Sequence, residues 1–295
     1  YSFDEFLEYR DEIYDISLVG KWPDGKEFFA ISAVPALYHR INAHLPEATY
    51  VTRYFEQAER EPYCVMTYTD KDGRQESHNE LNARYVDEDF LKVFDFKLLQ
   101  GNRQTALADA SSVVITQSIA RKYFGDDDAL GKVLELITGG PETRQTKFTY
   151  QVSAVLEDVP SNSFLQFEVL LPFRNFEDHY IQDVKNIWAW PGFFTFIRTD
   201  QAQDLKQLQV KINQLVPAEV HEDVLKLTGS TFSFKVLRFA DLHFLNSSWD
   251  SQLSVVSTGS RTYTLIIGLI GMAILIVASV NYVNLTTAKS LKRAK

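Results

Sequence analysis

The stretch SVVITQSIARKYFG, residues 112–125, predicts a strand that passes directly into a helix. The run Ser112–Ile115 is short, apolar and rich in β-branched residues, which favours a strand. Residues 117–124 favour a helix, and Gly125 directly after them is a usual helix end. A strand followed at once by a helix indicates a chain of mixed α and β structure.

The chain around this stretch, between residues 58 and 190, is rich in strand signals. A hairpin is expected where the sequence DKDG, residues 70–73, separates two strand-like runs. A short helix is expected near residues 87–94. Strands are expected at 63–69, 75–83, 132–137, 147–157 and 167–172.

Two β-α-β units flank this strand-rich middle. The first covers residues 12–57, where Pro35 opens a helix between two strands. The second covers residues 193–238, where strands enclose an amphipathic helix. The apolar positions of that helix are Leu205, Leu208, Ile212 and Leu215. We expect a split α/β layer with a mostly β insertion, preceded by a short amphipathic helix over residues 3–13.

The composition and charge of the chain exclude several classes of protein. Of 295 residues, 45% are hydrophobic and 23% are charged, which indicates a folded protein rather than a disordered one. Residues 1–260 carry 25 basic and 39 acidic residues, a net charge of −14, and this argues against nucleic-acid binding. The single cysteine, Cys64, excludes an internal disulfide and a zinc site built on several thiolates.

The C-terminal part of the chain has the pattern of a transmembrane helix. Residues 262–288 contain no charged residue, and a helix of this length spans about 40 Å, more than the roughly 30 Å of a bilayer core. We predict a membrane helix over 261–288 and a cytoplasmic basic segment over 289–295. Residues 1–260 are then periplasmic, and a further membrane helix is expected before Tyr1 to export them.

Small and polar residues interrupt this apolar segment. Gly268 and Gly271 allow close approach of a neighbouring helix, and Asn281 and Asn284 can donate hydrogen bonds across helices. We interpret these four residues as a helix-packing set. The alternative is that the two asparagines only lie near the lipid headgroups.

The sequence contains no pattern that predicts catalysis, a cofactor or a metal site. Gly125 and Gly131-Lys132 are separated by five residues rather than the four of a phosphate-binding loop, and Val133 replaces the metal-binding Ser or Thr. The six histidines form no zinc motif, and no nucleophile elbow is present. The aromatic group Trp188, Trp190, Phe193 and Phe194 is a candidate hydrophobic partner patch, with core packing as its alternative.

Four segments together resemble a known family. They are YVDEDFLKVFDFKLLQG (85–101), SVVITQSIARKYFG (112–125) followed by LGK (130–132), VSAVLEDVPSNS (152–163), and VNYVNLTTAKSLKRAK (280–295). In order and spacing they resemble the MacB-like periplasmic core domain and the start of the FtsX-like permease domain. The resemblance is strongest to the large ABC transporter permeases of Bacteroidota.

The resemblance implies an α+β fold with two lobes and one transmembrane helix. A porter-like lobe is formed by residues 1–57 and 191–260, and residues 58–190 form an inserted, strand-rich lobe that is similar to the one called Sabre. The family further implies a non-catalytic permease subunit in the bacterial inner membrane, with no cofactor of its own. Its expected partners are a cytoplasmic ABC ATPase on a separate chain, a second permease copy, and a periplasmic adaptor or cargo.

The function expected from this resemblance is coupling of cytoplasmic ATP hydrolysis to a periplasmic conformational change, for export or mechanotransmission. The alternative is the sensory ectodomain of a membrane receptor, in which a signalling domain would follow Lys295.

Overall fold

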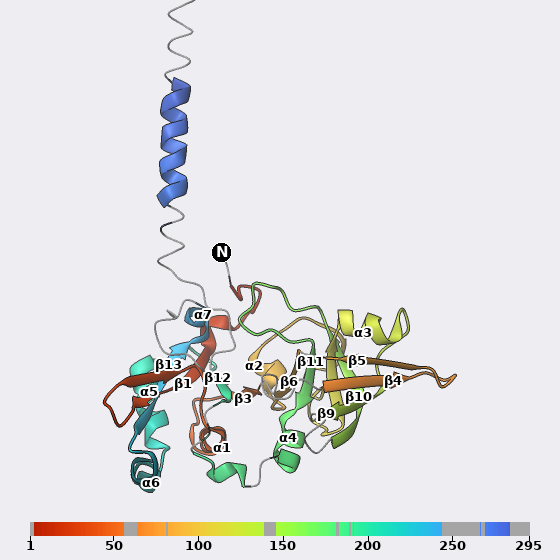
Figure 1. Ribbon diagram of the computed structural model, residues 1–295, viewed down its shortest axis with the longest axis horizontal. Helices are drawn as coiled ribbons and strands as arrows, with labels where there is room; N and C mark the ends of the chain where they lie inside the picture. The colour runs from red at the N-terminus through yellow and green to blue at the C-terminus, as the bar shows by residue number, and fades with distance from the viewer. Residues whose placement is uncertain are drawn as a thin grey trace, which may run out of the picture.

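Strands between residues 13 and 238 pair into one large sheet, and Figure 1 shows how the strands and helices are arranged. The structure is a computed structural model that describes residues 3–55, 64–80, 82–138, 146–180, 183–188, 190, 192–243, 266 and 269–283. Within these residues the sheet has thirteen strands, in the order β13-β1-β12-β3-β6-β11-β8-β10-β9-β4-β5, with β2 on β1 and β7 on β10. Their bounds are β1 Ile13–Lys21, β2 Glu27–Ala30, β3 Tyr50–Phe55, β4 Cys64–Thr69, β5 Gln75–Asn79, β6 Ala83–Val86, β7 Leu98–Gly101, β8 Ser112–Thr116, β9 Val133–Thr138, β10 Thr146–Leu156, β11 Val169–Pro172, β12 Phe194–Arg198 and β13 Thr231–Arg238.

Helices connect the strands and cover the sheet. The α-helices are α1 Pro35–His44, α2 Phe90–Val93, α3 Gln117–Phe124, α4 Phe173–Tyr180, α5 Leu205–Gln214, α6 Ala218–Thr228 and α7 Phe239–Leu242, and the 3-10 helices are η1 Arg10–Glu12 and η2 Val184–Asn186. This mixed α+β architecture with a large sheet confirms the expected fold class at that level.

The stretch at residues 112–125 has the structure that its pattern predicts. All five residues of β8 are buried, and α3 follows without an intervening loop. Helix α3 buries Ile119, Tyr123 and Phe124, and it ends at Gly125, whose φ of 61° is in the left-handed region that favours glycine. The strand–helix prediction is therefore confirmed.

Two predictions of local structure are wrong, and a third is confirmed over only part of its range. Residues 3–13 do not form an amphipathic helix, because only the short η1 is helical there and Asp4 has a φ of 56°. The single strand expected at 75–83 is two separate strands, β5 and β6, which pair with different partners. The helix expected near 87–94 is only the four residues of α2.

The two predicted β-α-β units interleave in space. Strand β12 of the second unit lies between β1 and β3 of the first, and β1 lies between β12 and β13. All three pairings are antiparallel, and β1 and β13 share eight register pairs. The two units are therefore joined by strand pairing.

The sheet buries two separate apolar cores on one face and a single core on the other. The first core packs α1 and α5 on β1, β3, β12 and β13, through residues such as Leu37, Ile212 and Phe234. The second core packs α3 and α4 on β6, β8, β10 and β11, through residues such as Tyr123 and Phe176. The opposite face carries one continuous, phenylalanine-rich core that includes residues of β3, β6, β8, β10 and β12. The lobe boundaries at residues 57/58 and 190/191 stay a prediction.

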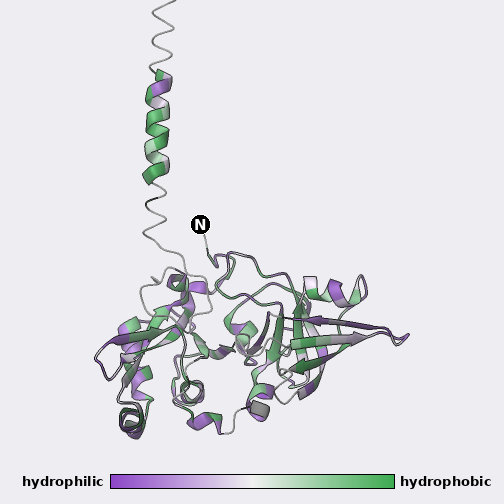
Figure 2. Cartoon of the chain, in the orientation of Figure 1, coloured by the Kyte–Doolittle hydropathy of each residue, from purple (hydrophilic) through white to green (hydrophobic). Residues whose placement is uncertain are grey.

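The described part of the C-terminal segment is a helix over residues 269–283. Figure 2 shows that this helix is dominated by hydrophobic residues. Among the described residues, no helix has both the length and the apolar character needed to cross a membrane. Gly271 and Asn281 lie in this helix, whereas Gly268, Asn284 and the basic segment 289–295 lie outside the described residues.

Candidate functional site

A polar position separates the two apolar cores at strand β3. Alternate residues of a strand face the same side, so Val51, Arg53 and Phe55 share one face of β3. Val51 belongs to the core under α1 and α5, and Phe55 belongs to the core under α3 and α4. Arg53 lies between them and is 1% exposed. The neighbouring strand β12 also has a buried polar residue at this position, because Thr195 is in register with Arg53.

The carboxylate of Asp87 holds Arg53 in three hydrogen bonds. The Arg53 side chain donates from Nε to Oδ2 at 3.0 Å and from Nη2 to Oδ1 at 2.7 Å, and its backbone N–H donates to Oδ2 at 2.6 Å. Strands β3 and β6 share only two register pairs, Tyr54↔Val86 and Phe55↔Tyr85. Asp87 directly follows β6, so its side chain continues the pairing where the backbone ladder ends.

Helices α1 and α4 complete the surroundings of Arg53. Its guanidinium lies between the rings of Tyr38 and Phe173, at 3.9 and 3.8 Å from their centroids. Glu177 Oε1 of α4 forms an ion pair with Arg53 Nη1 at 2.6 Å. His39 Nε2 of α1 is 3.5 Å from the same Glu177 oxygen. We call these six residues, Tyr38, His39, Arg53, Asp87, Phe173 and Glu177, the Arg53 cluster.

The charges in this cluster stabilise one another against burial. Burial opposes the charge of Arg53, but the attraction of Asp87 and then of Glu177 outweighs it and raises the pKa of Arg53. Burial likewise opposes ionisation of Glu177, but His39 and Arg53 outweigh it and hold the pKa of Glu177 below its usual value. A cavity of about 390 Å³ opens beside the cluster and is lined by residues of both α1 and α4.

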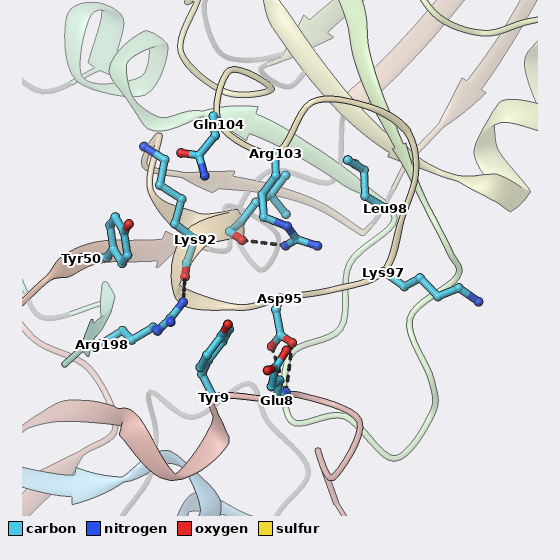
Figure 3. Close-up of a pocket in the computed structure, with 11 residues that line it drawn as sticks. Glu8, Tyr9, Tyr50, Lys92, Asp95, Lys97, Leu98, Arg103, Gln104 and Arg198 are labelled. Atoms are coloured by element: carbon cyan, nitrogen blue, oxygen red, sulfur yellow. Dashed lines mark hydrogen bonds between the residues drawn. The ribbon is translucent and has the colours of Figure 1, made fainter. Parts of the chain in front are cut away.

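A second cavity, of about 590 Å³, lies where the N-terminal segment meets α2 and the loop after it (Figure 3). Arg198 of β12 stacks on the ring of Tyr9 at 3.3 Å and donates to the carbonyl of Lys92 at 2.7 Å. Arg103 donates to the carbonyls of Leu91 and Phe96, at 2.7 and 2.6 Å. These bonds fix the ends of the short helix α2 and its loop.

Five of the charged side chains around this second cavity, those of Lys92, Asp95, Lys97, Arg103 and Arg198, make structural contacts. The Asp95 carboxylate accepts the backbone N–H of Glu8 at 3.0 Å, which ties the N-terminal segment to the α2 loop. Lys92 pairs with Asp89 at 2.8 Å, and Lys97 pairs with Glu157 at 3.0 Å. Among the residues that the structure describes, no group of three or more His, Cys, Asp or Glu side chains could hold a metal ion. The arrangement serves to anchor the N-terminal segment.

The two ends of the described body lie against each other. The ring of Phe3 stacks on that of His243, which directly follows α7, with centroids 3.3 Å apart. Helix α7 buries Phe239 and Leu242 and contacts both β1 and β13. The residues at both ends of the described body are therefore in contact, next to the edge strand β13.

The four aromatic residues expected to form a surface patch are divided between surface and core. Phe193 and Phe194 are 0% and 3% exposed and belong to opposite faces of the sheet, which corrects the expectation for these two. Trp190 is 42% exposed and packs edge-on against Phe193 at 5.1 Å, and Trp188 is half-buried. Partner binding by the two tryptophans stays a prediction.

The Arg53 cluster is the part of the site that sequence reasoning missed. A signal was present in the sequence VTRYF, residues 51–55, where a cation occupies an inward position of an otherwise apolar strand face. Its partners Asp87 and Glu177 lie 34 and 124 residues further along the chain, so no local pattern connects them to it.

Comparison with known proteins identifies one matching family and one solved structure with the same fold. The family model of the MacB-like periplasmic core domain matches residues 8–215. A crystal structure described as a domain of a permease protein from Porphyromonas gingivalis has a TM-score of 0.60 at 20% identity, covering 79% of this chain and 91% of that one, and so shares the fold. The periplasmic region of MacB from Actinobacillus actinomycetemcomitans has a TM-score of 0.47 at 12% identity, covering 79% and 92%. The extracellular domain of the noncanonic ABC-type transporter YknZ from Gram-positive bacteria has a TM-score of 0.44 at 14% identity, covering 76% and 99%. No curated protein matches this chain.

Proposed function

Because the chain belongs to the family of MacB-like periplasmic core domains, we propose that it is the extracytoplasmic part, with one adjoining membrane helix, of an ABC transporter permease subunit. In this role the chain carries no catalytic site, and ATP is hydrolysed by a separate cytoplasmic ATPase. The domain converts movement of its membrane helices into a conformational change in the periplasm. The family match over residues 8–215 is the observation that carries this proposal.

The contact between the two ends of the body supports coupling of this kind. The described part of the body ends at His243, whose ring is stacked on Phe3. Upstream of His243, α7 continues directly from β13, and β13 pairs with β1 over eight residues. Antiparallel pairing of that length transmits displacement as a unit, because sliding it would break all of its backbone hydrogen bonds. A pull on the C-terminal helix is thus applied to the sheet through β13 and to the N-terminal segment through Phe3.

We also propose the cellular setting that follows from this role. The subunit lies in the bacterial inner membrane with residues 1–260 in the periplasm, and it works as a dimer of permeases with a cytoplasmic ATPase. Residues 1–57 and 191–260 form the porter-like lobe, and residues 58–190 form the inserted, strand-rich lobe. A periplasmic adaptor or cargo contacts the outer body, for which Trp188 and Trp190 are candidate contacts. In the membrane, Gly268, Gly271, Asn281 and Asn284 pack the helix against its neighbours.

Hydrogen exchange of the full-length permease, purified from its own membranes into nanodiscs, tests this function. We expect an ABC ATPase to co-purify, and trapping with ATP and vanadate to change amide exchange in α7, β13 and β1 relative to the ADP state. The hairpin of β4 and β5, at the other end of the sheet, is the internal control and should change less. If no ATPase accompanies the protein and a signalling domain follows Lys295, the sensory alternative replaces this proposal.

A further inference from the structure

The Arg53 cluster lies between the two cores of the same sheet face. On that face the apolar contacts of β3 change from the α1 core at Val51 to the α4 core at Phe55, with Arg53 between them. On the opposite face Tyr54 belongs to the core that runs continuously from β12 across to β10. One face is therefore divided at this line, and the other is not.

Strand pairing is also short at this line. Strand β3 shares five register pairs with β12 but only two with β6. Helix α1 of one core and helix α4 of the other both contact Arg53, α1 through Tyr38 and α4 through Phe173 and Glu177. The β3–β6 ladder is only two residue pairs long. It has one continuous core on one face of the sheet and two separate cores on the other, which is the geometry of a hinge.

The two ion pairs of Arg53 differ in how firmly they are built. Asp87 makes three hydrogen bonds, including one to the Arg53 backbone, and it directly follows the strand that pairs with β3. Glu177 contacts Arg53 through a single pair of atoms, and its side chain is 18% exposed beside the 390 Å³ cavity. Water from this cavity can solvate Arg53 and Glu177 once they separate, which lowers the cost of parting two charges.

We propose that the Arg53 cluster is a latch on a hinge between the two halves of the sheet. Arg53 and Asp87 stay bound to each other at the hinge, and the contact between Arg53 and Glu177 of α4 is the one that breaks. In the closed state Glu177 holds α4 against Arg53 and against His39 of α1. In the open state α4 and its core rotate away from α1 about the β3–β6 ladder, and the cavity between the two helices widens. The existence of the latch does not depend on the proposed function. Only its biological role does, which is to pass movement on to the outer part of the domain.

Distance measurements between spin labels on the two halves test the latch. The full chain is labelled in nanodiscs at Ala43→Cys on α1 and Arg121→Cys on α3, both exposed, with Cys64→Ser as background. The test variant is Glu177→Gln, which keeps the shape of the side chain and removes its charge. The matched control is Asp178→Asn, one residue further on the same helix, which is exposed and lies 3.9 Å from Arg174.

We expect Glu177→Gln to raise the population at longer distance about tenfold, since a bond to a charged group is weakened, and Asp178→Asn to match the parent. Arg53→Lys, which keeps the charge but cannot bind both carboxylates and stack between two rings, should raise it as well. An unchanged distance distribution in Glu177→Gln would overturn the latch. Loss of cooperative unfolding in Glu177→Gln would also overturn the latch, because the cluster would then be a structural support of the fold.

The measurement contains neither ATPase nor ATP, so it separates the latch from the proposed function. One combined outcome is an open population in Glu177→Gln while the full complex shows no ATP-dependent change in amide hydrogen exchange. That result would support the latch and contradict only its role in coupling to the ATPase.

Discussion

Replacing Asp15 with Asn should stabilise the protein at alkaline pH and reduce the dependence of its stability on pH. Asp15 lies in β1, is 0% exposed, and accepts a hydrogen bond from the equally buried Ser17 hydroxyl. Its other oxygen, Oδ1, has no hydrogen-bond partner among the described residues. Burial raises the pKa of Asp15 from its ordinary value of 3.8 to about 7, and the Ser17 hydroxyl opposes this only in part.

The sign of the effect follows from the proton affinity of the two states. The folded state binds the Asp15 proton more tightly than the unfolded state does, so stability is fully present below pH 4 and declines as the pH rises to about 7. Above pH 7 the folded protein must carry the buried charge, and the decline reaches about 4 kcal/mol at most. An Asn side chain does not titrate, but its N–H groups need acceptors in the same site, which costs about 1–3 kcal/mol.

We therefore expect Asp15→Asn to increase the free energy of unfolding by about 1–3 kcal/mol at pH 8, and to change it little or lower it at pH 5. Thermal unfolding of the full chain in detergent, followed by tryptophan fluorescence from pH 5 to 8, measures both values. Each kcal/mol should shift Tm by about 2–4 °C. The control is Asp24→Asn, an exposed carboxylate whose pKa is lowered by hydrogen bonds from Lys26 and whose loss should not stabilise the protein. Parallel pH profiles for the parent and Asp15→Asn would refute the reasoning.

Three further predictions concern the backbone, the aromatic residues and the topology. Gly101→Ala should lower Tm more than Gly125→Ala: both glycines have positive φ, but only at Gly101 would the new Cβ lie 2.4 Å from a carbonyl oxygen, that of Ser153. Equal losses of unfolding free energy in the two variants, measured by urea titration, would contradict the steric argument. Phe193→Ala should cost about 3–5 kcal/mol of unfolding free energy, because it leaves a cavity in the core, whereas Trp190→Ala, at a residue 42% exposed, should cost clearly less; the opposite ranking would show that Trp190 is the core residue. A reporter active only in the periplasm should be active when fused near residue 250 and silent after Lys295, since four basic residues follow residue 288; the reverse pattern would show the opposite orientation.

Local sequence pattern correctly predicted those elements in which the spacing of apolar residues is enough to define the buried face. The helix marked by Leu205, Leu208 and Ile212 is α5, because that spacing places the three residues on one face whatever they pack against. Residues 231–238 form β13 for the equivalent reason, since alternate residues such as Phe234 and Val236 face one core.

Local pattern failed where a distant group determined the backbone. The apolar spacing of residues 3–13 is compatible with a helix, but the Asp4 carboxylate accepts the N–H of Phe164 and the hydroxyl of Ser163. These bonds hold the segment in an irregular conformation with Asp4 at a φ of 56°. Helix α6 was not predicted, and it has no fully buried residue, since only Val220 of this helix packs against the core under α1 and α5.

The sequence by itself determined the inward-facing residues of elements such as α5 and β13, the family, and the presence of two β-α-β units far apart in the chain. It could not determine that these units interleave, with β12 between β1 and β3, because a strand's alternation specifies its buried face and leaves its partner open. The same limit applies to Arg53. Its inward position can be read from residues 51–55, but its meaning depends on Asp87, Glu177 and the rings of Tyr38 and Phe173. Only the tertiary structure brings these groups together, since a buried charge is stabilised by whatever surrounds it in space.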